Sequence, residues 1–218
     1  MANSETKRAF LPGMGVDWLL PLYDPITTLL GLNYSRRELL RQAEMRPGHR
    51  VLDIGCGTGS LVVLTKASYP DVDVVGVDPD DRALARASRK ALRAGVKIEL
   101  DRGFSDALNH PDGTFDRVLS SFMFHHLGRD EKARTLREVR RVLKADGRLH
   151  LLDFAGADSA SRGSRLPRLH SHHRLTDNDE GTLLQLLDNA GFQSSTKTGE
   201  HALLGGFARA VYYRAGVW

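Results

Sequence analysis

Short apolar runs alternate with amphipathic helical segments through the middle of the chain. The strand-like runs cover 51–54, 72–77, 97–100, 115–121 and 148–154, and helical segments cover 61–68, 81–94 and 132–143. A strand followed by a helix and then by another strand is typical of a parallel sheet with helices on both faces. The pattern therefore predicts an α/β protein with a doubly wound, mostly parallel sheet.

Capping residues and glycines indicate where these helices begin and end. Asp80 or Asp81 is expected to cap the second helix, which ends before Gly95. Its expected packing face is formed by Leu84, Ala87, Ala91 and Leu92. The third helix carries Leu136, Val139, Val142 and Leu143 on its buried side. A turn at 145–147 is then expected to lead into the last of these strands.

The N-terminal part of the chain does not follow this alternation. Residues 1–46 are apolar in many positions and are expected to form a helical segment, with Ser35 capping a helix at 36–43. The simplest interpretation is a helix packed on the core or on a second subunit. The rest of the chain, 47–218, is expected to form the main domain.

The C-terminal part begins with a segment at 155–175 that is rich in Gly, Ser, Arg and His, which predicts a basic loop or lid. Acidic residues at 176–180 are a helix-start signature, and that helix is expected to end at Gly191. The segments 192–198 and 203–213 then predict a closing antiparallel pair.

Composition narrows the class of protein. The chain has 218 residues, of which 41% are hydrophobic and 27% charged, so it can bury a core as one domain with a small cap. No apolar stretch is long enough to span a bilayer, and the polar start at 1–8 argues against a signal peptide. A single cysteine, Cys56, excludes a disulfide framework and a multi-cysteine metal site. These features predict a cytoplasmic protein. A monomer and a homodimer are both left open.

The most informative segment, 51–60, reads Val-Leu-Asp-Ile-Gly-Cys-Gly-Thr-Gly-Ser. Glycines after a strand let the backbone turn sharply and approach a ligand, and the helix beyond presents free N–H groups. The dinucleotide fingerprint would require glycine at Ser60, and the acidic Asp53 favours a cationic ligand over a pyrophosphate. Asp78 ends the next strand, where a carboxylate can accept two ribose hydroxyls. Glycine loops alone are weak evidence, but with both acids a nucleoside cofactor is favoured over a purely structural turn.

The segments 51–60, 74–80 and 143–147 resemble the motifs of class I S-adenosylmethionine-dependent methyltransferases. The similarity is closest to the broad group of ubiquinone/menaquinone C-methyltransferases and small-molecule methyltransferases, whose fourth strand and following loop resemble 115–127. The resemblance implies a Rossmann-like sheet of seven strands with an antiparallel C-terminal strand. It also implies S-adenosylmethionine as cofactor, S-adenosylhomocysteine as product, and an N-terminal cap, 1–46, over the acceptor pocket.

The resemblance also assigns cofactor contacts. The methionine end of the cofactor would be held by Asp53, Gly55, Cys56, Gly57 and Gly59. Asp78 would bind the ribose, Pro79 would lie near the adenine, and Ser120, at the carboxyl end of the fourth strand, is a further expected cofactor contact.

The expected adenine contact departs from the family pattern. Relatives carry an acid after the third strand that contacts the adenine amine, whereas Phe104 stands at that position here. Either Asp106 takes that role, or Phe104 packs on the adenine while Ser105 supplies a backbone contact.

Candidate catalytic residues follow the fourth and fifth strands. They are His125, His126 and Asp153. A histidine there can act as a base or orient an acceptor hydroxyl, but a packed, hydrogen-bonded histidine is the interpretation that we favour about two to one. For Asp153, contact with the acceptor and a hydrogen bond at the strand end are balanced alternatives.

Two further features are interpreted conservatively. The histidines of 170–173 stand among arginines, which disfavours a divalent cation, so no metal is expected. A basic loop there would meet an anionic substrate or acidic headgroups, and a peripheral membrane contact by this loop and the N-terminal segment is a further hypothesis. Cys56, although in the glycine loop, is expected to pack rather than react.

Taken together, the residues and the resemblance predict an enzyme that methylates a small, lipophilic or aromatic acceptor. Two alternatives stay open. The basic pI of about 9.4 keeps a nucleic-acid methyltransferase in view, although no specific nucleic acid is expected because the motif typical of such enzymes does not follow the fourth strand. Phe104 keeps in view a scaffold that binds the cofactor without turnover.

Overall fold

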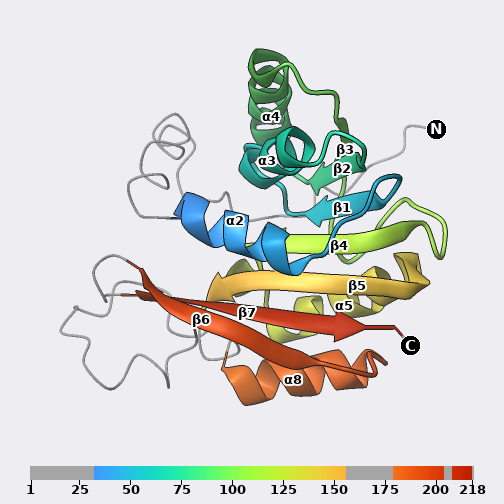
Figure 1. Cartoon of the computed structure of the whole chain (residues 1–218). Coiled ribbons are helices and arrows are strands. Elements are labelled where there is room, and N and C mark those ends of the chain that lie inside the picture. Colours follow the sequence, from blue (N-terminus) through green and yellow to red (C-terminus); the bar gives the residue numbers. More distant parts are fainter. Residues whose placement is uncertain (1–31, 156–178, 204–207, 218) are drawn as a thin grey trace, which may run out of the picture.

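A computed structural model describes residues 32–155, 179–203 and 208–217 (Figure 1). They form one sheet with the strand order β3-β2-β1-β4-β5-β7-β6. The strands are β1 Arg50–Ile54, β2 Asp73–Asp78, β3 Glu99–Arg102, β4 Phe115–Ser121, β5 Leu143–Phe154, β6 Thr196–Leu203 and β7 Ala208–Gly216. The first five pair in parallel, and β7 runs antiparallel to both β5 and β6. The predicted sheet, with its antiparallel C-terminal strand, is confirmed.

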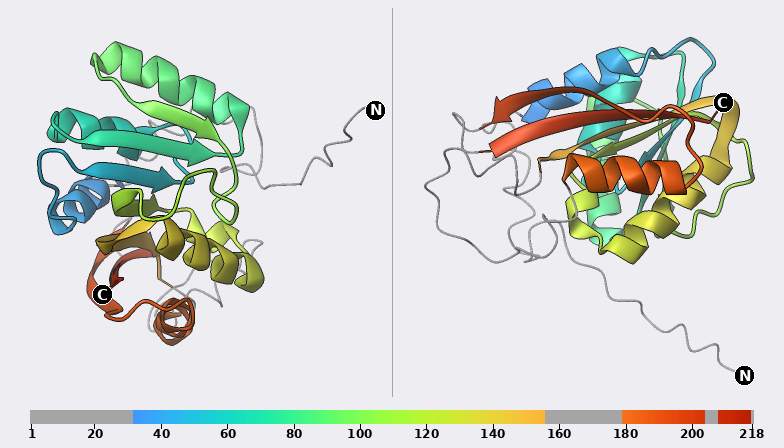
Figure 2. Two further views of the ribbon diagram at one scale, coloured as in Figure 1. Left: turned by 90° about the vertical axis from the view of Figure 1, so that its right-hand side faces the viewer. Right: turned by 90° about the horizontal axis from the view of Figure 1, so that it is seen from below.

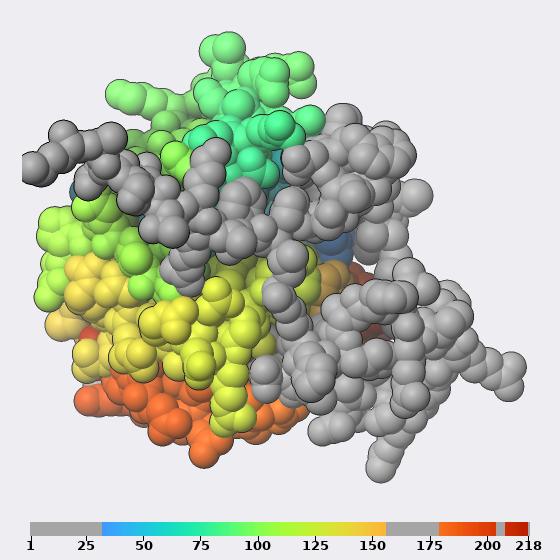
Figure 3. Space-filling model, turned by 180° about the vertical axis from the view of Figure 1, so that it is seen from behind, coloured from blue at the N-terminus to red at the C-terminus, as the bar shows by residue number. Residues whose placement is uncertain are grey.

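Helices cover both faces of this sheet. The helices α2 Leu32–Gln42, α3 Ser60–Ser68 and α4 Asp81–Ala94 lie on one side, and α5 Arg129–Val142 and α8 Glu180–Asn189 lie on the other. Figure 2 shows this arrangement from two further directions, and in Figure 3 the atoms of α5 and α8 lie on the face seen from behind. A short 3-10 helix, η2 Phe124–His126, follows β4.

Each face of the sheet buries its own apolar cluster. Leu52, Phe115 and Leu136 are wholly buried between the sheet and the α5 side, whereas Val51 and Leu39 are wholly buried on the α2 side. Burying one such side chain stabilises the fold by roughly 1.5–3 kcal/mol. Burial on both faces explains the continuous apolar runs that predict the central strands.

The helix signals are confirmed at α4, with one correction. The carboxylate of Asp80 accepts a hydrogen bond from Arg82 N at 2.8 Å, and Gly95 closes the helix with a φ of 65°. The buried face, however, is Ala83, Ala87 and Ala91. Leu92, expected on the packed face, is 81% exposed. The prediction was wrong because small alanines let this helix approach the sheet closely and turned the leucine outward.

Two other local predictions were also wrong. Ser35 does not cap a helix but lies inside α2, where its Oγ is 2.9 Å from His201 Nε2. The expected turn at 145–147 belongs to β5, which bulges here because Phe115 pairs with Leu143 and Arg117 pairs with Arg148. In both cases the local structure is set by contacts with distant segments, which are β6 for Ser35 and β4 for the bulge in β5.

The C-terminal elements are a helix followed by two strands, which are the types and the order that the sequence predicts. Asp179 caps α8 through a hydrogen bond from Thr182 N at 2.9 Å, and β6 and β7 form the expected antiparallel pair. Most of the predicted cap at 1–46 and nearly all of the predicted basic loop at 155–175 lie outside the described residues, so both stay predictions. Within the described ranges, none of the helices has the length and apolar character needed to cross a bilayer.

Candidate functional site

The glycine loop connects β1 to α3 at the carboxyl edge of the sheet. Gly55, Gly57 and Gly59 all have positive φ, at 65°, 53° and 77°. The N–H groups of Gly55 and Cys56 both donate to Val77 O, at 2.8 and 3.0 Å, which fixes the loop to β2. Only glycine adopts this run of left-handed residues without strain.

The three glycines have different neighbours. A Cβ on Gly55 would lie 2.3 Å from Met123 Cγ, and one on Gly59 would lie 2.6 Å from Ala87 Cβ, so packing requires these two. A Cβ on Gly57 would meet no atom within 4 Å. Gly57 is therefore the loop position whose bare backbone is free to approach a ligand.

Asp53 is a buried carboxylate beside this loop. It is 1% exposed, and neither of its oxygens has a hydrogen-bond partner among the described residues. Burial raises its pKa well above the ordinary value, the charge of Arg36 lowers it, and Asp78 raises it further. A buried carboxylate in this position is stabilised by a cationic ligand, which fits the ammonium and sulfonium groups of S-adenosylmethionine.

Asp78 lies across the loop from Asp53, at the end of β2. One of its oxygens accepts a hydrogen bond from Gly57 N at 2.8 Å, and the other accepts one from Asp80 N at 2.9 Å. Burial raises the pKa of Asp78, while these two backbone donors oppose the rise. Because each carboxylate oxygen can accept a second hydrogen bond, Asp78 retains the capacity to bind two hydroxyls of a ribose.

Two residues that sequence reasoning missed adjoin this region. Arg36 projects from α2, is 2% exposed, and its guanidinium carbon lies 5.9 Å from the ring centroid of Phe122. Phe122 is a buried aromatic residue with a φ of 56°, a strained backbone state for a bulky side chain. The Phe122 ring centroid is 4.8 Å from that of Phe154. Only the tertiary structure reveals these contacts, since no motif in the sequence marks them.

The expected adenine region follows β3. Phe104 and Pro79 are half-buried. The Oγ of Ser105 lies 3.0 Å from Thr135 Oγ1, and the carboxylate of Asp106 accepts a hydrogen bond from Arg134 Nε at 2.9 Å. Both polar side chains are therefore engaged by α5, and Phe104 is the side chain of this segment best suited to pack on an adenine.

The candidate catalytic residues meet where β4 and β5 end. Asp153 is 2% exposed, with one oxygen 2.6 Å from His125 Nδ1 and the other accepting a hydrogen bond from His125 N at 2.8 Å. Burial works to raise the pKa of Asp153, but attraction and hydrogen bonding from His125 hold that pKa below its ordinary value. The ring of His126 lies against that of His125, with centroids 4.0 Å apart. Ser120 is buried on β4, and its Oγ has no hydrogen-bond partner among the described residues.

Cys56 is buried in the loop, and burial raises the pKa of its thiol well above the ordinary value. Its sulfur packs near Gly76, where an added Cβ would lie 2.9 Å away. A protonated, packed thiol is inert, as the sequence predicts. In the described part of the chain, no group of three His, Cys, Asp or Glu side chains is arranged to hold a metal. The histidines of 170–173 lie outside it.

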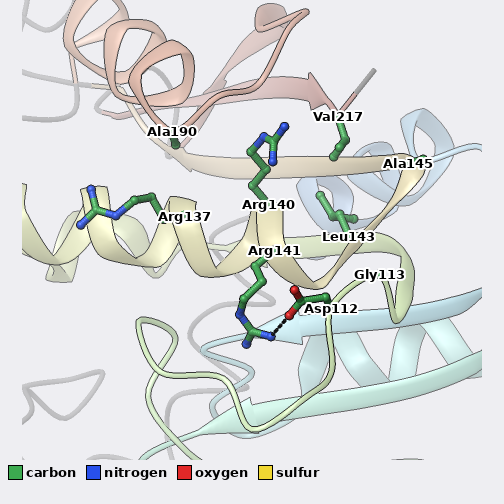
Figure 4. Close-up of a pocket in the computed structure, with 9 residues that line it drawn as sticks. All are labelled: Asp112, Gly113, Arg137, Arg140, Arg141, Leu143, Ala145, Ala190 and Val217. Carbon is green, nitrogen blue, oxygen red and sulfur yellow. Dashed lines mark hydrogen bonds and ion pairs between the residues drawn. The ribbon is translucent and has the colours of Figure 1, made fainter.

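A pocket of about 520 Å³ lies elsewhere, at the amino ends of β4 and β5 (Figure 4). Arg137, Arg140 and Arg141 project from α5 around it, and Arg141 binds Asp112 at 2.7 Å. In open α/β sheets ligands bind outside the carboxyl ends of the strands. This pocket is therefore distinct from the candidate site.

Comparison with known proteins identifies the family to which the chain belongs. A family profile described as "Methyltransferase domain" matches residues 51–147. The demethylmenaquinone methyltransferase of Thermus thermophilus is 38% identical over 140 residues, which cover 62% of each chain. The ubiquinone/menaquinone biosynthesis C-methyltransferase of Syntrophotalea carbinolica is 33% identical over 73% of this chain and 67% of its own.

Solved structures share the fold. The YcgJ protein of Bacillus subtilis superposes with a TM-score of 0.69 at 21% identity, covering 84% of this chain and 97% of that one. Among the curated relatives, the chain spans somewhat less than two thirds of those from Thermus thermophilus and Deinococcus radiodurans, at 62% and 65% of their lengths.

The chain belongs to the S-adenosylmethionine-dependent methyltransferases with a Rossmann-like sheet, because the Syntrophotalea carbinolica enzyme matches it over two thirds of both chains and the fold, glycine loop and paired acids agree. Their cofactor is S-adenosylmethionine, and the residues around Asp53 fit it. Within that class, the chain is most similar to a broad group of enzymes that includes the ubiquinone/menaquinone C-methyltransferases, here called the ubiquinone/menaquinone C-methyltransferase-like group.

Proposed function

We propose that this protein is an active methyltransferase that transfers a methyl group to a small lipophilic acceptor, of which a hydroquinone is the first to test. The names of the relatives support a quinone-type acceptor. The observation that carries catalysis is the His125–Asp153 pair, with Asp153 Oδ1 and His125 Nδ1 2.6 Å apart.

S-adenosylmethionine, when bound, supplies a methyl group on a sulfonium sulfur, and the protein positions the nucleophile. Asp53 and the backbone of Gly57 would hold the methionine end, Asp78 would hold the ribose, and Arg36 would add a positive charge beside Asp53. Loop residues Gly55, Cys56 and Gly59 shape this site through packing, and Phe104 and Pro79 would contact the adenine.

Asp153 has a defined part in this proposal. It fixes His125 with Nδ1 protonated, so that Nε2 carries the free lone pair. Nε2 then takes the proton from an acceptor hydroxyl, which raises the electron density of a hydroquinone ring or frees an oxygen nucleophile. Phe122 and Phe154 offer aromatic surface beside this histidine, since the ring centroids of His125 and Phe154 are 5.2 Å apart. Their apolar character favours an aromatic acceptor.

The first test is calorimetric titration with S-adenosylmethionine, S-adenosylhomocysteine and NADH, with Asp78→Ala as the control. We expect both adenosyl compounds to bind and the variant to lose them. Binding of NADH alone would contradict the assignment. Binding without transfer to any hydroquinone, phenol or nucleic acid would favour the non-catalytic scaffold.

The second test separates the histidines. We expect His125→Gln to lower kcat for a short-chain demethylated hydroquinone by about 10²- to 10⁴-fold while the affinity for the cofactor stays unchanged. His126→Gln is the matched comparison, because its ring lies on the same short helix. If both variants show an equally small loss in kcat, the two histidines have only a packing role. Transfer to nucleic acid in preference to hydroquinones would favour the nucleic-acid alternative.

A further inference from the structure

The outer surface of α4 carries a row of arginines. Arg82, Arg86, Arg89 and Arg93 follow one another at intervals of four, three and four residues. With 3.6 residues per turn they lie within about 60° of one another on the helix surface, along roughly 16 Å. We call these four residues the α4 arginine row.

This helix concentrates the basic charge of the protein. It holds the four arginines and Lys90 against a single acid, Asp81, which gives a net charge of +4. The formal net charge of the whole chain is also +4, so acids and bases balance in the rest of the sequence. The modest total thus hides a strongly basic patch at one edge of the sheet, beside β3 (Figure 1).

Most of the row has no partner within the described part of the chain. None of the described residues forms an ion pair or hydrogen bond with the side chains of Arg86, Arg89 or Arg93. The arginines of α5 contrast with them, because Arg134 binds Asp106 at 2.9 Å and Arg141 binds Asp112 at 2.7 Å.

The fold does not require this row. The buried face of α4 is formed by Ala83, Ala87 and Ala91, which make up a separate row on the helix surface. Like charges four residues apart destabilise a helix by a few tenths of a kcal/mol each. Arg89 and Arg93 are exposed and Arg86 is part-buried, and none of these three belongs to the buried face of α4. A row of like charges that costs helix stability is explained by an extended anionic surface that it meets.

We propose that the α4 arginine row docks the protein on the anionic surface of a lipid bilayer. This inference rests on the proposed function, because a lipophilic acceptor dissolves in a bilayer. Leu92, 81% exposed beside Arg89 and Arg93, favours a bilayer over a nucleic acid, since a leucine gains by entering the headgroup boundary and gains nothing on a phosphate backbone. Because α4 starts directly after Asp78-Pro79-Asp80, the row begins at the edge of the candidate site.

The test is flotation with vesicles of phosphatidylcholine alone or with about one third phosphatidylglycerol. The full chain is compared with the triple variant Arg86→Gln/Arg89→Gln/Arg93→Gln. A control triple, Arg37→Gln/Arg46→Gln/Arg137→Gln, removes the same charge from exposed arginines elsewhere.

We expect the full chain to bind only the anionic vesicles, and less at high salt. Each arginine near an anionic surface contributes about fivefold in partitioning, so the α4 triple variant loses roughly 100-fold and the control triple far less. Both triples should methylate a short-chain, water-soluble hydroquinone as the full chain does, which separates failure of docking from failure of the proposed function.

Three results would overturn the inference. The first is that the full chain fails to float with anionic vesicles. The second is equal loss in both triples, which would mean that net charge alone matters. The third is α4-dependent binding to single-stranded RNA in preference to anionic vesicles, which would assign the row to a nucleic acid.

Discussion

His150 is a buried histidine whose ring makes the fold sensitive to acid. It lies on β5 between Leu119 of β4 and Arg214 of β7, is 1% exposed, and neither ring nitrogen has a hydrogen-bond partner among the described residues. The pKa of His150 is lowered from 6.5 to about 3, chiefly by burial and then by the positive charges of Arg117, Arg214 and Arg148. The imidazole is therefore neutral in the folded protein at all but strongly acid pH.

The size of the effect follows from linkage. Below about pH 6.5 the imidazole of His150 binds a proton in the unfolded chain but stays neutral in the folded chain. The free energy of unfolding therefore falls as the pH falls towards about 3. One pKa unit corresponds to about 1.36 kcal/mol, which gives a loss of about 2 kcal/mol between about pH 7 and pH 5 and a limit of about 5 kcal/mol below pH 3.

The perturbation is His150→Leu, which keeps the approximate volume and removes both nitrogens. We expect the variant to be more stable than the wild type at about pH 7 by about 1–3 kcal/mol, because no buried polar atom is left unsatisfied. At about pH 5 the advantage should grow by about 2 kcal/mol. Urea unfolding at both pH values measures the two differences.

The control is His49→Gln, whose ring is only part-buried and whose Nδ1 accepts a hydrogen bond from Arg46 N at 3.2 Å. This variant should keep most of the acid sensitivity. If His150→Leu and the wild type lose the same stability between the two pH values, the buried imidazole is not the source and the reasoning fails.

Three further outcomes are expected at the cofactor site. Because burial raises the pKa of Asp53 and a cationic cofactor favours the ionised form, affinity for S-adenosylmethionine should rise with pH and binding should release protons; calorimetry in buffers of different ionisation enthalpy checks this, and zero proton release contradicts it. Gly57→Ala should lower that affinity about tenfold or more, whereas Gly48→Ala, which also has a positive φ and no atom within 4 Å of an added Cβ, should cost stability but leave affinity intact; an equal loss of affinity in both variants would refute the backbone contact. Cys56 should react with a thiol reagent only as fast as the chain unfolds, and Cys56→Ala should keep cofactor binding, so rapid native labelling would exclude a packed thiol.

The sequence alone predicted the elements whose signals are local. Periodicity in strands and helices, the cap at Asp80 and the closing Gly95 depend on neighbours within a few residues, and the structure confirms them. The strand-glycine-helix pattern also located the loop at 55–59 and the acids at its edge, because the carboxyl ends of parallel strands meet at one edge of a sheet. The structure brings Asp78 to Gly57 N at 2.8 Å and Asp153 to His125 Nδ1 at 2.6 Å.

Contacts between segments far apart in sequence were decided only by the tertiary structure. Arg36 approaches Phe122 across 86 positions, and nothing local marks either residue as part of the site. Ser35, expected as a cap, is instead buried against β6 and β7, and Leu92 turns outward because alanines suffice to pack α4. The physical reason is the same in these cases. Which face of a helix is buried depends on the segment that packs against it, and the energy of a buried charge depends on the groups around it. The local sequence pattern specifies neither.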